Sequence, residues 1–126
     1  MKKIPDQRIE KIVAKHPEFT PDAYVFVSES VNHTVTKLAQ LRHVSAMELL
    51  CGARELARVK FGAAAPGVLD KWGIRRASDF GKLVYLMIDA GILGASDGDK
   101  PEDFDVDFSF SQLPVYKISG TLPVLD

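Results

Sequence analysis

The sequence predicts a mainly α-helical protein, with about five helices packed as one small domain and a short C-terminal β-hairpin or strand pair. Two observations favour helices: apolar residues recur at helical spacing between residues 6 and 90, and residue types that stabilise helix ends precede several of these stretches. A third observation indicates the β element, because residues 103–110 alternate strictly between polar and apolar side chains. This order of elements is also compatible with a winged-helix arrangement.

The first two predicted helices are delimited by prolines. Residues 6–16 carry an apolar stripe at helical spacing, and Pro17, which cannot continue a helix, follows them. The second helix is predicted over residues 21–40, because Thr20 and Pro21 are residue types preferred at the N-cap and at the first helical position. Each of these helices therefore has a sequence signal for at least one of its ends.

The third helix has the most specific local signal in the chain. Ser45 and Glu48 are spaced as a capping box, in which each side chain accepts a hydrogen bond from the backbone N–H of the other residue. We therefore expect a helix over residues 46–61, ended by Gly62.

A central helix is predicted around six consecutive apolar residues, 83–88, which cannot all lie on one face and should be buried on nearly all sides. Ser78 is a suitable N-cap, and Asp79 places a negative charge at the positive end of the helix dipole. Gly91 suits the left-handed conformation that ends many helices. We therefore predict a helix over residues 79–90.

A short helix over residues 66–72 is predicted to lead into the central helix. Trp72 is expected to be largely buried and to anchor this short helix, while Gly73 lets the chain turn tightly beside the ring. Gly81 costs roughly 1 kcal/mol relative to alanine inside a helix. Its presence therefore predicts that another backbone approaches the first turn of the central helix closely.

The last part of the chain is expected to leave the helical body. Residues 103–110 are predicted to form a half-buried strand with a solvated acidic face. Residues 111–126 are apolar but interrupted by proline and glycine, so an extended tail on the surface or on a neighbouring subunit is expected. The chain, residues 1–126, then forms one domain with a peripheral helix in residues 1–17 and a core in residues 18–110.

Composition and charge narrow the class of protein. The 46% hydrophobic and 26% charged contents are ordinary for a soluble globular protein, and no apolar run is long enough to span a membrane. The N-terminus lacks the apolar segment of a signal peptide, so a cytoplasmic location is expected.

Residues 1–94 carry a net charge of +4 and residues 95–126 one of −5. Such an acidic tail could fold back, bind a basic partner or maintain solubility.

The single cysteine, Cys51, excludes an internal disulfide and a zinc site with cysteine partners. It lies in an apolar helical stretch, which predicts a buried and inert thiol, with a nucleophile as the alternative.

Metal binding has little support in the sequence. His16 and His33 lie on different predicted helices and lack metal-ligand spacing. The acidic stretch 97–107 fails as an EF-hand, because Glu102 stands where glycine is required and Phe108 where the bidentate glutamate is required. A solvated strand face is favoured over weak calcium binding, so no metal and no cofactor are predicted.

Several short motifs together resemble a small family of bacterial proteins filed under a placeholder locus name, the Minf-type family. The likeness covers roughly residues 20–110. It rests on five segments: Arg42-His43-Val44-Ser45, Glu48-Leu49-Leu50, Phe61-Gly62, Trp72-Gly73-Ile74 and Asp79-Phe80-Gly81. The resemblance implies a small stand-alone protein and nothing about activity, because the family has no assigned function.

Four basic residues around the turn before the central helix are candidates for binding a partner or a nucleic acid: Lys71, Arg75, Arg76 and Lys82. In a winged helix, the second helix enters the DNA major groove and a β wing follows it. The predicted central helix is too apolar to read a groove, and the acidic strand would repel phosphate. Nucleic-acid binding is therefore the alternative interpretation.

Arg42, His43 and Asp79 are the candidates for a polar site. A histidine such as His43 can act as a general base, but hydrogen bonding to a backbone carbonyl before the helix is the favoured role. Asp79-Phe80-Gly81 matches the magnesium-binding triplet of kinases, but the chain lacks the glycine-rich loop and catalytic loop that a kinase needs. No catalytic residue is therefore assigned.

The function predicted from these observations is a non-enzymatic protein-interaction or self-associating module. Its expected partner is another protein or a second copy of the chain, with no membrane partner. A degenerate winged-helix nucleic-acid-binding protein is the alternative.

Overall fold

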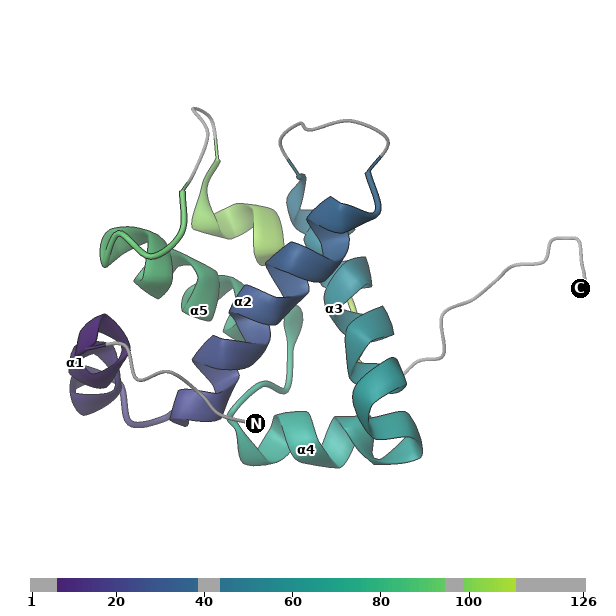
Figure 1. Ribbon diagram of the computed structural model, residues 1–126, viewed down its shortest axis with the longest axis horizontal. Helices are drawn as coiled ribbons and strands as arrows, with labels where there is room; N and C mark the ends of the chain where they lie inside the picture. Colours follow the sequence, from purple (N-terminus) through teal and green to yellow (C-terminus); the bar gives the residue numbers. More distant parts are fainter. Residues whose placement is uncertain (1–6, 39–43, 95–98, 111–126) are drawn as a thin grey trace, which may run out of the picture.

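The computed structural model describes residues 7–38, 44–94 and 99–110, and within them the chain is built from helices (Figure 1). The α-helices are α1 (Gln7–Lys15), α2 (Pro21–Thr36), α3 (Ala46–Phe61), α4 (Ala65–Lys71) and α5 (Ala77–Asp89). Two short 3₁₀-helices are η1 (Gly62–Ala64), directly after α3, and η2 (Pro101–Phe104).

The mainly helical class is confirmed, but two parts of the fold prediction are wrong. The described residues contain no strand, so the expected C-terminal β-hairpin is missing from residues 99–110, and with it the β wing of a winged helix. The described body is formed by four helices of nine or more residues, α1, α2, α3 and α5, rather than by five. The remaining segment, α4, has only seven residues.

The predicted strand over residues 103–110 is wrong because its aromatic side chains pack into a helical core. The aromatic residues at alternate positions are buried or partly buried: Phe104, Phe108 and Phe110. Pro101 begins η2, and the Asp103 carboxylate accepts a hydrogen bond from the Lys100 N–H (3.3 Å), which turns the chain helically. An extended segment here would also need a neighbouring strand to take up its backbone hydrogen bonds.

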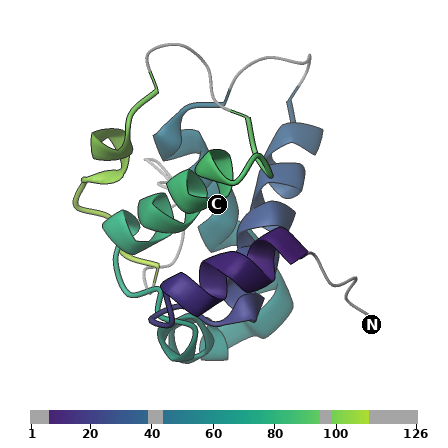
Figure 2. The same cartoon turned by 90° about the vertical axis from the view of Figure 1, so that its left-hand side faces the viewer.

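Helix α2 is the central helix of the body, since it packs against α1, α3 and α5 (Figure 1, Figure 2). In Figure 1, α3 lies on one side of α2, α1 and α5 lie toward the other side, and α4 runs below them. η2 packs on α5 and also contacts α3. The core therefore lies where α2, α3 and α5 meet, and residues 99–110 cover part of it.

The contact between α2 and α3 depends on a glycine. A Cβ atom at Gly52 would overlap the Thr34 side chain, so a glycine is needed for this close approach. The buried Ser30 hydroxyl donates to the Phe26 carbonyl (2.8 Å), and the Thr34 hydroxyl donates to the Ser30 carbonyl (2.8 Å). Both hydroxyl groups are therefore satisfied within α2 and cause no desolvation penalty at the contact.

Phe80 of α5 is at the centre of the aromatic core. It is fully buried, and its ring centroid lies 6.5 Å from that of Phe26, 6.2 Å from that of Phe104 and 5.9 Å from that of Phe110. A Cβ atom at the next residue, Gly81, would overlap the Phe104 side chain. Gly81 therefore does mark a close approach, but of a side chain rather than of a backbone.

The starts of α3 and α5 differ in how well the sequence predicted them. The Ser45 Oγ accepts from the Glu48 N–H (3.1 Å) and the Glu48 Oε1 accepts from the Ser45 N–H (3.0 Å), which confirms the capping box. Ser78 is not the N-cap of α5, because the helix already begins at Ala77.

Helix α5 ends at a glycine in the left-handed conformation, as predicted. Gly91 has a φ of 79°. Its N–H donates to the Ile88 carbonyl (3.0 Å), and the Ile92 N–H donates to the Met87 carbonyl (2.8 Å). This is the Schellman pattern, which satisfies carbonyl groups that the helix end would otherwise leave unpaired.

Trp72, which follows α4, is partly rather than largely buried. Its ring packs against α2 and α3, with centroids 5.8 Å from that of Phe26 and 5.6 Å from that of Phe61. Its carbonyl accepts a hydrogen bond from the Thr20 N–H (3.3 Å). The turn after α4 is therefore held against the start of α2.

The N-terminal helix α1 packs on α2, and its Arg8 guanidinium donates to the Gly91 carbonyl after α5 (3.1 Å).

Helix α2 ends at Thr36, before the predicted end at residue 40. The predicted extended tail, residues 111–126, lies outside the described residues.

Replacing Gly81 with alanine is expected to destabilise the protein, because the added Cβ must displace Phe104. Overpacking of this kind costs roughly 1–3 kcal/mol in the free energy of unfolding. Gly67 in α4 is the matched control, since nothing lies within 4 Å of a Cβ there, and Gly67→Ala is expected not to destabilise. Urea unfolding measures both variants, and equal losses would contradict the close contact.

Replacing Ser45 with alanine is expected to lower the free energy of unfolding by roughly 0.5–2 kcal/mol, because the N-cap acceptor is lost. Glu48→Ala removes the reciprocal bond at the same helix end, so the two losses should not add. Equilibrium unfolding of both single variants and the double variant measures this coupling. Strictly additive losses would show that the two residues act independently.

Candidate functional site

The four basic residues predicted as a binding surface do not all remain open for a partner. Two of them are paired with carboxylates: Arg75 with Asp70, and Lys82 with Glu18 (2.8 Å). Lys71 and Arg76 are exposed. Because half of the positive charge is already neutralised, the cluster offers little attraction for phosphate groups.

Asp79, a predicted polar-site residue, stabilises the start of α5. Its Oδ2 accepts hydrogen bonds from the backbone N–H groups of Arg75 (2.9 Å) and Arg76 (3.0 Å). Its negative charge also lies at the positive end of the α5 dipole, as predicted. The other two polar-site candidates, Arg42 and His43, lie outside the described residues.

Two histidines lie beside glutamates that also bind lysines. The His33 Nε2 is 3.1 Å from the Glu55 Oε1, which also accepts from Lys37, so this group ties α2 to α3. The His16 Nδ1 lies 3.5 Å from the Oε2 of Glu18. Among the residues that the structure describes, no group of three or more His, Cys, Asp or Glu side chains could hold a metal ion.

Cys51 is exposed, so the prediction of a buried thiol is wrong. Its neighbours Gly52 and Ala53 are buried, whereas Cys51 lies on the outer side of α3. The apolar composition of the stretch therefore did not show which residues of the helix face inward.

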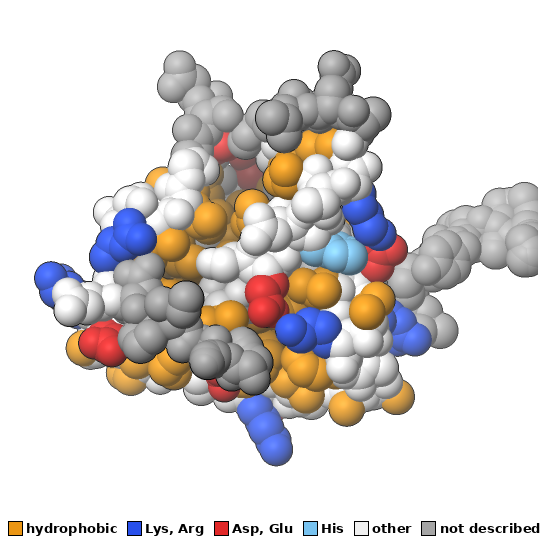
Figure 3. Space-filling model, viewed as in Figure 1, with side chains coloured by type: hydrophobic (Ala, Val, Ile, Leu, Met, Phe, Trp, Pro, Cys, Tyr) orange, Lys and Arg blue, Asp and Glu red, His pale blue; other side chains and the backbone are white. Residues whose placement is uncertain are grey.

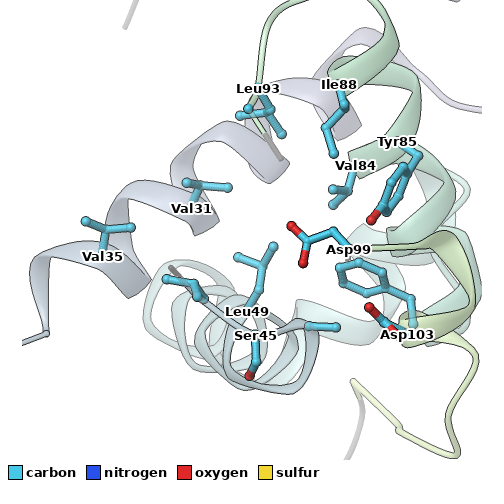
Figure 4. A pocket seen from close by; sticks show the side chains of 14 residues that line it. Val31, Val35, Ser45, Leu49, Val84, Tyr85, Ile88, Leu93, Asp99 and Asp103 are labelled. Carbon is cyan, nitrogen blue, oxygen red and sulfur yellow. The ribbon is translucent and has the colours of Figure 1, made fainter. Parts of the chain in front are cut away.

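The candidate site is a hollow between α2, α3 and α5, with a volume of about 250 Å³ (Figure 4). Its apolar lining includes Val31 and Val35 of α2, Leu49 of α3, and Val84 and Ile88 of α5. In the space-filling view, hydrophobic side chains remain visible between α5 and α2 (Figure 3). The hollow is therefore open to solvent although most of its lining is apolar.

One wall of the hollow is acidic. The Asp99 carboxylate points in among the apolar side chains, and Asp103 lies at the same wall (Figure 4). The Asp103 carboxylate lies 3.8 Å from the Lys100 Nζ, besides accepting from the Lys100 N–H. Burial raises the pKa of the Tyr85 phenol, and the charges of Asp99, Asp103 and Glu102 raise it further. Burial and the neighbouring carboxylates therefore both disfavour the ionised form of the Tyr85 phenol.

A second, shallower hollow lies on the outer side of α5, with a volume of about 400 Å³. Its lining carries charges of both signs, including Lys82, Asp89 and Glu102. Tyr85 lines both hollows. The more enclosed hollow, between α2, α3 and α5, is the better defined site.

No pattern in the sequence indicated this hollow. Val31 and Val35 lie on the apolar stripe of α2, which predicts burial, but both are only partly buried. In the sequence, Asp99 lies in the acidic stretch 97–107, which fails as an EF-hand, and Asp103 was predicted to lie on the solvated face of a strand. No local pattern brings these two sets of residues together, because they lie more than 60 positions apart in the chain.

Comparisons with known proteins gave no match: no protein-family model, no curated protein and no solved structure matches the chain. The resemblance to the Minf-type family therefore stays a prediction that rests on its motifs. Of the helices in the described ranges, none is both long and apolar enough to cross a membrane.

Lys82 is expected to keep Glu18 ionised at low pH. Hydrogen bonding from Lys82, followed by hydrogen bonding to the backbone, lowers the pKa of Glu18 from 4.5 to about 2. Because this pKa lies below the unfolded value, the stabilisation is complete above pH 4.5 and is lost as the pH falls from 4.5 towards 2. NMR titration is expected to show the lowered pKa, and Lys82→Ala should return it towards 4.5.

The matched control for this titration is Lys71→Ala, which removes an exposed cation from the same region and should leave the Glu18 pKa unchanged. A Glu18 carboxyl that titrates near 4.5 in the wild-type protein would contradict the ion pair.

Proposed function

We propose that this protein is a non-enzymatic protein-interaction module that receives a side chain of its partner in the hollow between α2, α3 and α5. The supporting observation is the apolar lining that remains open to solvent. Val31, Val35 and Ile88 are partly buried, although fully buried core residues lie next to them in α2 and α5. Covering such surface contributes about 25 cal/mol for each Å² of apolar area removed from water.

The chemistry of the lining favours binding over catalysis. Nucleophilic catalysis requires a hydroxyl or thiol beside a base that removes its proton. Ser45 lines the hollow, but its Oγ accepts the Glu48 N–H as part of the capping box. Among the described lining residues there is no histidine, lysine or cysteine that could pair with it.

The size of the hollow supports a single inserted side chain. Its volume of about 250 Å³ lies below the range of roughly 300–1,000 Å³ that is usual for pockets holding drug-sized ligands. A partner that inserts one side chain and touches the rim makes a small interface, as is common in transient complexes.

A nucleic acid is a poorer fit for this protein than another protein. The carboxylates at the hollow and the acidic residues after it would repel phosphate groups. Arg75 and Lys82 are paired with carboxylates, which reduces the net positive charge of the basic cluster predicted from the sequence. Another protein, including a second copy of the chain, is therefore the better-fitting partner.

A photoreactive benzophenone amino acid in place of Met47, which is exposed and adjacent to the lining residue Ala46 but does not itself line the hollow, is expected to cross-link the partner without filling its site. The captured protein is then purified and titrated calorimetrically against the wild-type protein and Val31→Phe. The added ring of Val31→Phe occupies the space that the partner's side chain would fill. Burying one apolar side chain contributes roughly 1.5–3 kcal/mol to binding, so its loss should weaken binding roughly tenfold or more.

The matched control is Val59→Phe, because Val59 is 74% exposed on α3 and does not line the hollow. This variant should bind with unchanged affinity, and urea unfolding checks that Val31→Phe remains folded. Val35→Phe is a second variant that fills the hollow. Unchanged binding by both filled variants, or equal capture from positions 47 and 59, would contradict the proposal. Capture of a second copy would identify self-association.

A further inference from the structure

The outer face of α5 carries a stripe of four residues whose order is self-complementary: Lys82, Tyr85, Leu86 and Asp89. Residues at these spacings lie on one face of an α-helix. All four line the shallower hollow beside α5, on the side of the molecule seen in Figure 2. The stripe therefore has a positive end, an apolar middle and a negative end.

The opposite face of α5 forms the core, where Leu83, Val84 and Met87 are buried. On the outer stripe, the two charged residues are exposed, and Tyr85 and Leu86 between them are only partly buried. Exposed apolar surface with charged residues at its edge is typical of protein interaction sites. The stripe therefore keeps apolar surface that a partner can cover.

We propose that this stripe binds a second copy of the chain, with the two α5 helices antiparallel across a two-fold axis between Tyr85 and Leu86. Lys82 of each copy then lies opposite Asp89 of the other, and Tyr85 of each copy lies opposite Leu86 of the other. The inference goes beyond the proposed function, because this dimer does not need a ligand in the hollow between α2, α3 and α5.

The order of the stripe selects the antiparallel arrangement. In a dimer with two-fold symmetry, both copies use the same surface and every contact occurs twice. The antiparallel register that pairs Lys82 with Asp89 also brings Tyr85 and Leu86 together at the axis. A parallel pair would place each charged residue opposite its own copy, and like charges at such positions repel.

Asp89 is unfavourable for its own helix. It lies in the last turn of α5, at the negative end of the helix dipole, and that turn contains no basic residue. In the antiparallel dimer, the Asp89 carboxylate lies beside the N-terminal half of the other α5, where the dipole is positive and Lys82 adds a further positive charge. This placement supports an intermolecular role for Asp89.

Lys82 can take part in the dimer although its ammonium group donates to Glu18 (2.8 Å). An ammonium group has three N–H donors, so it can interact with a second carboxylate. Glu102 and Asp105 line the same hollow from η2 and the residue after it, outside the stripe. Their negative charges oppose association of two copies, whereas a basic partner would use them. The two kinds of partner can therefore be distinguished by substitution.

Sedimentation equilibrium of the full chain measures the dissociation constant of the dimer. Asp89→Lys replaces two ion pairs with two repulsions and should weaken the dimer roughly tenfold. The double variant Lys82→Glu with Asp89→Lys restores opposite charges and should recover most of the affinity. The matched control is Glu102→Lys, which changes the charge of the same hollow equally but lies outside the stripe, and it should not weaken the dimer.

Cysteine cross-linking locates the two-fold axis. Leu86→Cys combined with Cys51→Ser leaves one thiol in each chain, beside the axis, where two thiols can form a disulfide in the presence of oxidised glutathione. Val59→Cys combined with Cys51→Ser is the matched control, because Val59 is 74% exposed on α3 and lies outside the stripe. Covalent dimer is expected from position 86 alone, and urea unfolding checks that each variant remains folded.

A chain that stays monomeric up to concentrations on the order of 1 mM would overturn the inference. Equal weakening by Asp89→Lys and Glu102→Lys would indicate a basic partner instead and would overturn it as well. So would a double variant no tighter than Asp89→Lys, or equal cross-linking from positions 59 and 86. Val31→Phe fills the other hollow and should leave this dimer unchanged, so the failure of the inference is distinguishable from the failure of the proposed function.

Discussion

The packing of aromatic rings around Phe80 is the interaction on which the rest of the structure depends. Its ring meets Phe26 of α2 from one direction, and Phe104 and Phe110 of the C-terminal segment from others. Aromatic pairs of this kind contribute about 0.5–1.5 kcal/mol each beyond the area that they bury. Because Phe80 lies near the start of α5, its burial sets the position of α5 against α2 and holds residues 104–110 on the body.

The same packing creates the hollow. Gly81 leaves the space in which Phe104 lies, and Phe104 is the last residue of η2. With η2 held on α5, Asp99 and Asp103 reach the edge of the gap between α2, α3 and α5. The acidic wall is therefore a consequence of core packing, although neither Phe80 nor Gly81 lines the hollow.

The charge asymmetry of the chain now has a partial structural explanation. The acidic residues 99–110 fold back on the helical body, which was one of the three alternatives that the sequence left open. Arg54 of α3 helps to hold this segment, because its guanidinium donates to the Ser109 carbonyl (3.3 Å) and lies 4.4 Å from the centre of the Phe108 ring.

The sequence by itself determined the features that depend on neighbouring residues. The capping box of Ser45 and Glu48 and the glycine stop at Gly91 are confirmed, because these signals act within one turn of a helix. Only the tertiary structure decided that residues 103–110 turn and pack their aromatic rings instead of pairing as a strand, and that Cys51 faces outward. The hollow belongs to this second group, since Val31 and Asp99 meet only after three helices and η2 have packed around Phe80, and no local pattern encodes a contact between such distant residues.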